Sequence, residues 1–259
     1  MYRFLLTRRW LGLLLVAVCV AAACAFLGRW QLHRLEFKMA RNHLISGNAA
    51  ATPVPPTRIL RVDHRPPVAD QWRRVRATGR YDVAHTLLVR NRTLQGAVGF
   101  DVLVPFVTDD GPALLVNRGW VPVDESVPGG VPRRVPPPPP GEVTVLARVR
   151  GSEPASTTGT PPPGQVTRID VSSIREGLPY PVYGGYGELT RERPRGSHAP
   201  TPLPLPQLTE GQHIAYAIQW FLFGLMALGY YALLARREAN DRRTVSEGRA
   251  PVVSVRVSG

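Results

Sequence analysis

Two long apolar runs lie near opposite ends of the chain, at residues 10–28 and 214–235, and neither contains a charged residue. A helix needs about 20 apolar residues to cross the hydrocarbon layer of a bilayer. Both runs have that length. The pattern therefore predicts two transmembrane helices that enclose a largely polar stretch.

The arginines beside these runs predict the orientation. Short tails rich in Lys and Arg stay in the cytoplasm, whereas a long loop is translocated largely regardless of its charge. The arginines of the two tails are Arg3, Arg8, Arg9, Arg236, Arg237, Arg242, Arg243 and Arg249. We therefore expect a multi-pass protein of the cell (plasma) membrane, with both termini cytoplasmic and the central domain extracytoplasmic.

Two other interpretations of the first run stay open. Ala21-Ala22-Ala23 before Cys24 resembles a lipoprotein cleavage site, and Thr7-Arg8-Arg9 resembles a twin-arginine signal. The apolar run continues for several residues beyond Cys24, which an anchor needs and a cleaved signal does not. Neither alternative removes the second span.

Between the spans, the pattern changes from helical to alternating. Leu32, Leu35 and Met39 recur at helical spacing until Pro53 ends the pattern. Beyond it, short alternating segments predict strands at 71–82, 86–91, 100–108, 113–117 and 142–150. We expect a meander of antiparallel strands. The proline runs 136–140 and 161–163 are predicted to be surface loops, 184–187 a tight turn and 191–206 an extended strap.

The predicted fold class is thus a membrane protein with two transmembrane α-helices flanking an extracytoplasmic antiparallel β-rich domain, a small barrel or a sandwich. The segments are a cytoplasmic tail at 1–9, the first span at 10–28, a juxtamembrane helix and linker at 29–52, the β-rich domain with its proline-rich loops at 53–206, a membrane-approach segment at 207–213, the second span at 214–235 and a basic cytoplasmic tail at 236–259.

Composition narrows the function. The net charge is +13, but the arginines are dispersed and form no recognisable nucleic-acid-binding module, so we expect contact with the lipid bilayer and no nucleic-acid partner. Both cysteines, Cys19 and Cys24, lie in the first apolar run. The central domain therefore has no disulfide and no thiolate ligand for copper, which disfavours direct copper delivery.

The sequence predicts no enzyme. It contains no serine-hydrolase elbow, no phosphate-binding glycine loop, no zinc-protease motif and no dinucleotide fingerprint. The acidic residues are sparse, and the histidines show no mutual metal-ligand spacing. We expect no catalytic residue and no resident metal.

The conspicuous residues lie where the apolar runs meet the polar stretch. Trp30 and Tyr216 are typical interfacial anchors, whereas Gln219 inside the second run needs a hydrogen-bond partner, which favours a helix–helix or protein–protein contact. The candidate interaction residues are Trp30, Gln31, Arg34, Arg118, Trp120, Tyr216, Gln219 and Trp220.

Four segments together resemble a known family. The junction 28–34, the strand 75–82, the segment 115–122 and the helix start 213–221 are similar, in this order and topology, to signatures of the Surfeit locus protein 1 family of cytochrome oxidase assembly proteins. The resemblance implies a non-enzymatic factor that assists maturation of an aa3-type cytochrome c oxidase at haem a insertion. Its implied partners are the haem-copper subunit and the haem a synthesis machinery, and haem a is a transient cofactor. The alternative is an extracytoplasmic scaffold or sensor subunit of another membrane complex, without a cofactor. An enzyme acting on lipid or cell wall ranks third.

Within that resemblance, His213 is the candidate haem ligand, because it directly precedes the second apolar run and haem iron is often held by histidine. It could equally be an interfacial histidine. Arg118 has two candidate partners, a carboxylate of the domain or a haem propionate. Gly119 is expected to supply a backbone conformation that a side chain would forbid, and Trp120 to pack on the barrel end.

Overall fold

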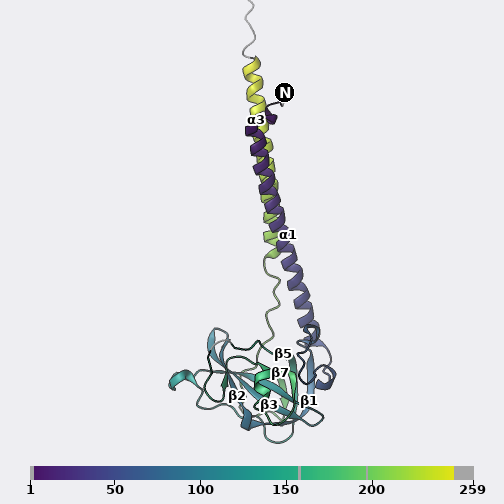
Figure 1. Cartoon of the computed structure of the whole chain (residues 1–259), viewed down its shortest axis with the longest axis vertical. Helices are drawn as coiled ribbons and strands as arrows, with labels where there is room; N and C mark the ends of the chain where they lie inside the picture. The colour runs from purple at the N-terminus through teal and green to yellow at the C-terminus, as the bar shows by residue number, and fades with distance from the viewer. Residues whose placement is uncertain (1–2, 157–158, 197, 248–259) are drawn as a thin grey trace, which may run out of the picture. The chain divides into compact units, whose positions relative to one another are not determined.

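The computed structural model describes residues 3–156, 159–196 and 198–247 (Figure 1). The chain forms two units, one made of Met1–Arg41 with Thr209–Gly259 and the other of Asn42–Leu208. The helices are η1 (Arg3–Leu6), α1 (Arg8–Ala50), η2 (Pro56–Arg58), η3 (Val68–Asp70), η4 (Val83–His85), η5 (Pro128–Gly130), α2 (Val171–Arg175) and α3 (His213–Glu247). The strands are β1 (Arg74–Tyr81), β2 (Leu87–Leu94), β3 (Ala97–Thr108), β4 (Ala113–Pro122), β5 (Val143–Gly151), β6 (Gln165–Val166) and β7 (Val182–Arg193).

The first unit contains the two apolar runs as helices. Within the described residues, Arg8–Ala50 and His213–Thr244 are long and apolar enough to cross a membrane. The predicted span and the predicted juxtamembrane helix form one continuous helix, α1, which ends before Pro53 as expected. The expected tail after residue 235 begins as helix, since α3 continues to Glu247 and Arg242 pairs with Glu238 one turn earlier at 2.8 Å.

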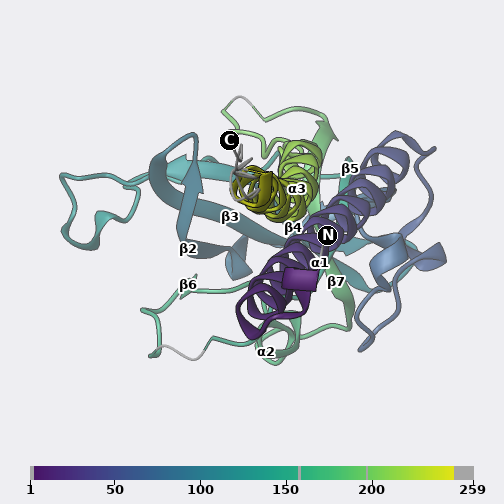
Figure 2. The same cartoon turned by 90° about the horizontal axis from the view of Figure 1, so that it is seen from above.

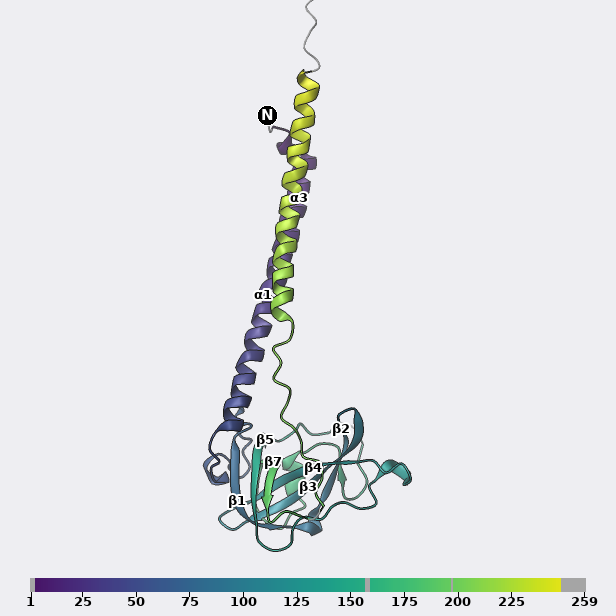
Figure 3. The same ribbon diagram turned by 180° about the vertical axis from the view of Figure 1, so that it is seen from behind.

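Small residues let α1 and α3 pack closely (Figure 3). An added Cβ at Gly28 would lie 2.8 Å from the ring of Phe221, and one at Gly224 would lie 3.3 Å from Cβ of Cys24. Near the other end, Trp10 clusters with Ala235. The two helices therefore run antiparallel within this unit, with glycine and alanine at their contact, as helix pairs in membranes commonly do.

The second unit is built around a small closed barrel, and Figure 2 shows strands of this unit from above. The strand order is β1-β5-β7-β4-β3-β2-β6, and β1 also pairs with β3, so the five strands β1, β5, β7, β4 and β3 close on themselves. Closure leaves these strands without a free edge. Of the two predicted architectures, the barrel is the one that forms.

Alternating side chains fill the barrel, because successive residues of a strand face opposite sides. The interior residues are Leu60, Val75, Ala77, Phe106, Leu114, Val116, Val143, Val145, Ala147, Val149 and Tyr183. A second cluster lies on the opposite side of β3 and β4, where Leu103 and Leu115 pack against Ile174 of α2. Both faces of β3 and β4 are therefore buried.

The prediction of a purely antiparallel meander is wrong. β4 pairs with β7 in parallel, and β2 pairs with β6 in parallel. The glycine-rich segment 184–187 is not a tight turn but part of β7. An added Cβ at Gly184 would lie 2.3 Å from the backbone oxygen of His64, and one at Gly187 would lie 2.8 Å from Cβ of Ala147. Because these glycines have no side chain, neighbouring segments of the same chain can approach them closely. Glycine is therefore common in such strands as well as in turns.

The predictions for the strap at 191–206 and for the proline run at 136–140 also need correction. The expected strap at 191–206 begins as strand, since β7 continues to Arg193. In the run 136–140, Pro138 and Pro139 are buried rather than on the surface. This run lies over the barrel, where the backbone oxygen of Pro136 accepts a hydrogen bond from Arg118 at 2.9 Å.

Candidate functional site

The structure brings His213 and Gln31 together in the first unit. His213 begins α3, and its Nδ1 lies 2.8 Å from Oε1 of Gln31 on α1. The neutral tautomer with its proton on Nδ1 donates to this carboxamide oxygen, and in that tautomer Nε2 carries the lone pair. Nε2 is buried and has no hydrogen-bond partner within the part of the chain that the structure describes. In that tautomer the pair presents an oriented imidazole whose Nε2 can accept a ligand bond, which is the form that binds metals.

The other predicted junction residues do not join this pair. Trp30 is 54% exposed and Tyr216 is 47% exposed, and the interfacial role expected of both stays a prediction. Arg34 and Gln219 are also exposed. Trp220 is half-buried, and its ring contacts that of Phe223 on the same helix at 6.0 Å. Among the described residues, the side chain of Gln219 has no hydrogen bond to α1, and its interaction role stays a prediction.

Arg118 is occupied inside the barrel domain. Its Nη2 donates to Oε1 of Glu192 at 3.0 Å, and the hydroxyl of Tyr81 donates to the other carboxylate oxygen at 2.9 Å. The side chains of Arg118 and Glu192 are 0% and 4% exposed. Of the two partners considered for Arg118, the carboxylate of the domain is the one it has, which argues against a haem propionate.

The two residues after Arg118 contact the segment around Thr201 and hold it against the barrel. Gly119 has φ of +131°, and an added Cβ would lie 2.4 Å from the backbone oxygen of Thr201. This confirms the expected backbone role. Trp120 forms backbone hydrogen bonds in both directions with Thr201, and its indole N–H donates to the backbone oxygen of Arg92 at 3.0 Å. Trp120 is 8% exposed, as a packing residue should be.

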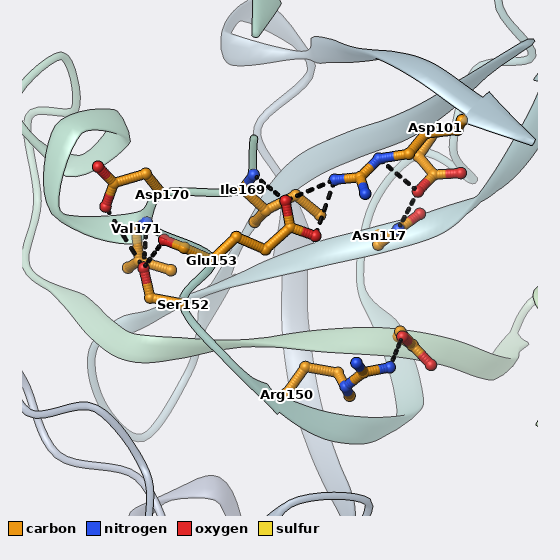
Figure 4. A network of polar contacts seen from close by, with 10 residues as sticks. Asp101, Asn117, Arg150, Ser152, Glu153, Ile169, Asp170 and Val171 are labelled. Atoms are coloured by element: carbon orange, nitrogen blue, oxygen red, sulfur yellow. Dashed lines mark hydrogen bonds and ion pairs between the residues drawn. The ribbon is translucent and has the colours of Figure 1, made fainter. Parts of the chain in front are cut away.

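Sequence reasoning missed a buried polar network in the same domain (Figure 4). Arg92 binds both carboxylate oxygens of Glu153 at 2.8 Å and lies 3.5 Å from Asp101. Asp101 also accepts a hydrogen bond from Asn117 at 3.0 Å, and Glu153 accepts one from the backbone N–H of Ile169. Burial raises the pKa of Asp101 to about 6, against the opposing effect of Asn117 and Arg92.

A second missed group lies on β5 and β7. Glu188 pairs with Arg148 at 3.3 Å and also with Arg150, whose guanidinium lies 3.9 Å from the ring centre of Trp72. Burial raises the pKa of Glu188, and the two arginines oppose that shift. The sequence signalled these buried ion pairs only by a charged residue within an apolar strand, as at Asp101. That signal does not identify the arginine with which the carboxylate pairs.

The comparison with known families covers both units. The model of the SURF1 family matches residues 18–225, from within α1 to within α3. The chain belongs to the SURF1 family.

Relatives agree with that assignment. A SURF1-like protein of Mycobacterium tuberculosis is 37% identical over 260 aligned positions, which cover 96% of this chain and 91% of the relative. Surfeit locus protein 1 of Takifugu rubripes is 32% identical over 112 residues, or 37% of this chain and 45% of that protein. The cytochrome oxidase assembly protein SHY1 of Saccharomyces cerevisiae is 28% identical over 106 residues, or 40% of this chain and 26% of that protein. The SURF1 family match includes Gln31, Arg118 and His213.

Proposed function

We propose that this SURF1-family protein is a membrane-anchored, non-enzymatic assembly factor for an aa3-type cytochrome c oxidase. In this proposal it assists haem a insertion, with the haem-copper subunit and the haem a synthesis machinery as its partners. The name of the yeast relative supports the oxidase as the complex that is assembled. The two long apolar helices support the anchoring.

One observation carries the haem step of the proposal. Nε2 of His213 is buried and without a partner in the described residues, while Nδ1 is held by Gln31 at 2.8 Å. When bound, haem would supply an iron atom that an imidazole nitrogen can ligate. His213 would hold the iron through Nε2, and Gln31 would fix the tautomer and the orientation of the ring. The residues present therefore fit the group.

We also propose the topology that the arginines indicate, with both tails cytoplasmic and the barrel domain outside. Reporter fusions after Tyr2 and after Val253 should both report the cytoplasm, and one inserted at Gly159 should report the outside. An extracytoplasmic signal from either tail, or a mature N-terminus at Cys24, would contradict two anchors.

Deleting the gene is expected to remove most of the haem a absorbance of the oxidase while b-type and c-type haems stay unchanged, because the proposal assigns one cofactor step to the protein. His213→Ala should reproduce part of that loss. His213→Gln should not restore it, since a carboxamide keeps polarity but is a poor iron ligand. Reduced-minus-oxidised difference spectra of membranes measure all three haem types.

Two further variants separate ligation from folding. Gln31→Leu leaves the imidazole but removes its acceptor, so haem affinity of the purified protein should fall about 10-fold or more. His33→Ala is the matched control, because His33 is an exposed histidine of α1 whose partner is Glu36.

A normal level of haem a after deletion of the gene would reject the assembly function. A stable partner other than the oxidase would then favour the scaffold or sensor alternative.

A further inference from the structure

Three arginines surround a hollow on the outer wall of the barrel. The hollow has a volume of about 330 Å³ and is lined by Arg76 of β1, Thr144 and Leu146 of β5, and Arg191 and Arg193 of β7. The strand register explains the grouping. Leu146 is paired with Arg76 on one side and with Arg191 on the other, and Thr144 is paired with Arg193. The guanidinium groups therefore belong to one face of three adjacent strands.

These arginines differ from the other strand arginines of the domain. Arg118 is paired with Glu192, while Arg148 and Arg150 are paired with Glu188. In contrast, the side chains of the three arginines that line the hollow make no ion pair or hydrogen bond with any residue in 3–156, 159–196 or 198–247. The carboxylate of Glu192, which stands between Arg191 and Arg193 in sequence, is buried, because alternate residues of β7 face opposite sides.

Arg76 and Arg191 lie on either side of Leu146, and Arg193 follows two residues along β7, so three like charges share one small area of the sheet and repel one another. Replacing any one of the arginines with a neutral residue would reduce this repulsion. No ion pair or hydrogen bond within the described chain explains why all three are present. An anion would remove the repulsion from outside.

We propose that this hollow binds a phosphate group. A phosphate carries a charge of about −1.5 to −2 and three strong acceptor oxygens, so it can take one guanidinium at each oxygen, whereas a carboxylate offers two oxygens and a single charge. A hydroxyl completes the set. Oγ1 of Thr144 lies 3.3 Å from Oγ1 of Thr78, and one hydroxyl proton of this pair remains to donate to the ligand.

The source of the phosphate is a soluble phosphate monoester or a phospholipid that ends in a phosphate monoester, as phosphatidic acid does, and both present the same three acceptor oxygens. The site is separate from the His213–Gln31 pair, and the proposal does not depend on the proposed role in oxidase assembly.

The test uses the full chain in a neutral detergent with inorganic phosphate as the probe, titrated by calorimetry at low salt. Arg76→Gln and Arg191→Gln should each weaken binding about 10-fold or more, because each removes a charge-assisted hydrogen bond. Arg80→Gln is the matched control. Arg80 is exposed on the same strand as Arg76 but does not line the hollow, and it should change the affinity much less. Equal effects of the three variants, or no binding by the parent protein, would overturn the site.

Folding does not confound this comparison, since Arg76 and Arg191 are exposed and circular dichroism can verify each variant. A second arm identifies the source. In nanodiscs that contain phosphatidic acid, a lipid-binding site would show weaker apparent affinity for inorganic phosphate than in discs of phosphatidylcholine, whose phosphodiester lacks the third free oxygen. Equal affinities in the two discs would assign the site to soluble phosphate compounds.

Discussion

Glu192→Ala is expected to lower the free energy of unfolding of the barrel domain by about 3–5 kcal/mol, the typical cost of removing one partner of a buried ion pair. The guanidinium of Arg118 would stay 0% exposed without its carboxylate, which now lies at 3.0 Å. Tyr81 would lose the acceptor of its hydroxyl at 2.9 Å. Denaturant titration of the full chain, followed by tryptophan fluorescence to which Trp72 and Trp120 of this domain contribute, measures the change.

Two further variants test the cause of that loss. Glu142→Ala removes an exposed carboxylate directly before β5 and should change the stability little. Replacing both partners, in Arg118→Met with Glu192→Leu, should recover much of the loss because no unpaired charge remains buried. A loss for Glu192→Ala as small as that for Glu142→Ala would show that the pair contributes little to the fold.

The domain is expected to lose about 3 kcal/mol of stability between pH 4 and pH 7 through Asp101 alone. Its pKa is about 6 in the folded domain against 3.8 for an ordinary aspartate, and burial is the main cause. A carboxyl group with a raised folded pKa binds more protons folded than unfolded, so its contribution is complete below pH 4 and disappears as the pH rises through 6. Each unit of pKa shift corresponds to 1.36 kcal/mol.

Asp101→Asn tests this assignment, because asparagine keeps an oxygen for the hydrogen bond from Asn117 and removes the titration. Unfolding measured at pH 4, 5, 6 and 7 should show a flatter profile for this variant. Some slope should remain, since burial also raises the pKa of Glu188. Asp109→Asn is the control, because Asp109 lies in an exposed turn. If the stability of Asp109→Asn changed as little with pH as that of Asp101→Asn, the role of Asp101 would be contradicted.

Local pattern alone predicted much of the architecture. The two apolar runs predicted the long helices, and Pro53 predicted the end of α1 at Ala50. Alternation predicted β1, β3 and β5 within a few residues, because side chains on a strand change face at every step. The resemblance carried by segments such as 28–34 and 213–221 predicted the SURF1 family, which the family match from 18 to 225 confirms.

The pairing of distant segments was decided only in the folded chain. β7 joins β4 in parallel and β5 in antiparallel, and this arrangement converts the segment 184–187 from an expected turn into strand. Asp101, Glu188 and Glu192 are scattered in sequence, and each meets its arginine only when two strands of the sheet lie side by side.

The same holds for His213 and Gln31, which are 182 positions apart yet 2.8 Å from one another. The periodicity of apolar residues predicts which face of a single helix or strand is buried. It does not predict which other element covers that face. The sequence by itself therefore determined the helices, most of the strands and the family. Only the tertiary structure decided the ion pairs, the free Nε2 of His213 and the unpaired arginines of the barrel wall, because each depends on contacts between elements far apart in the chain.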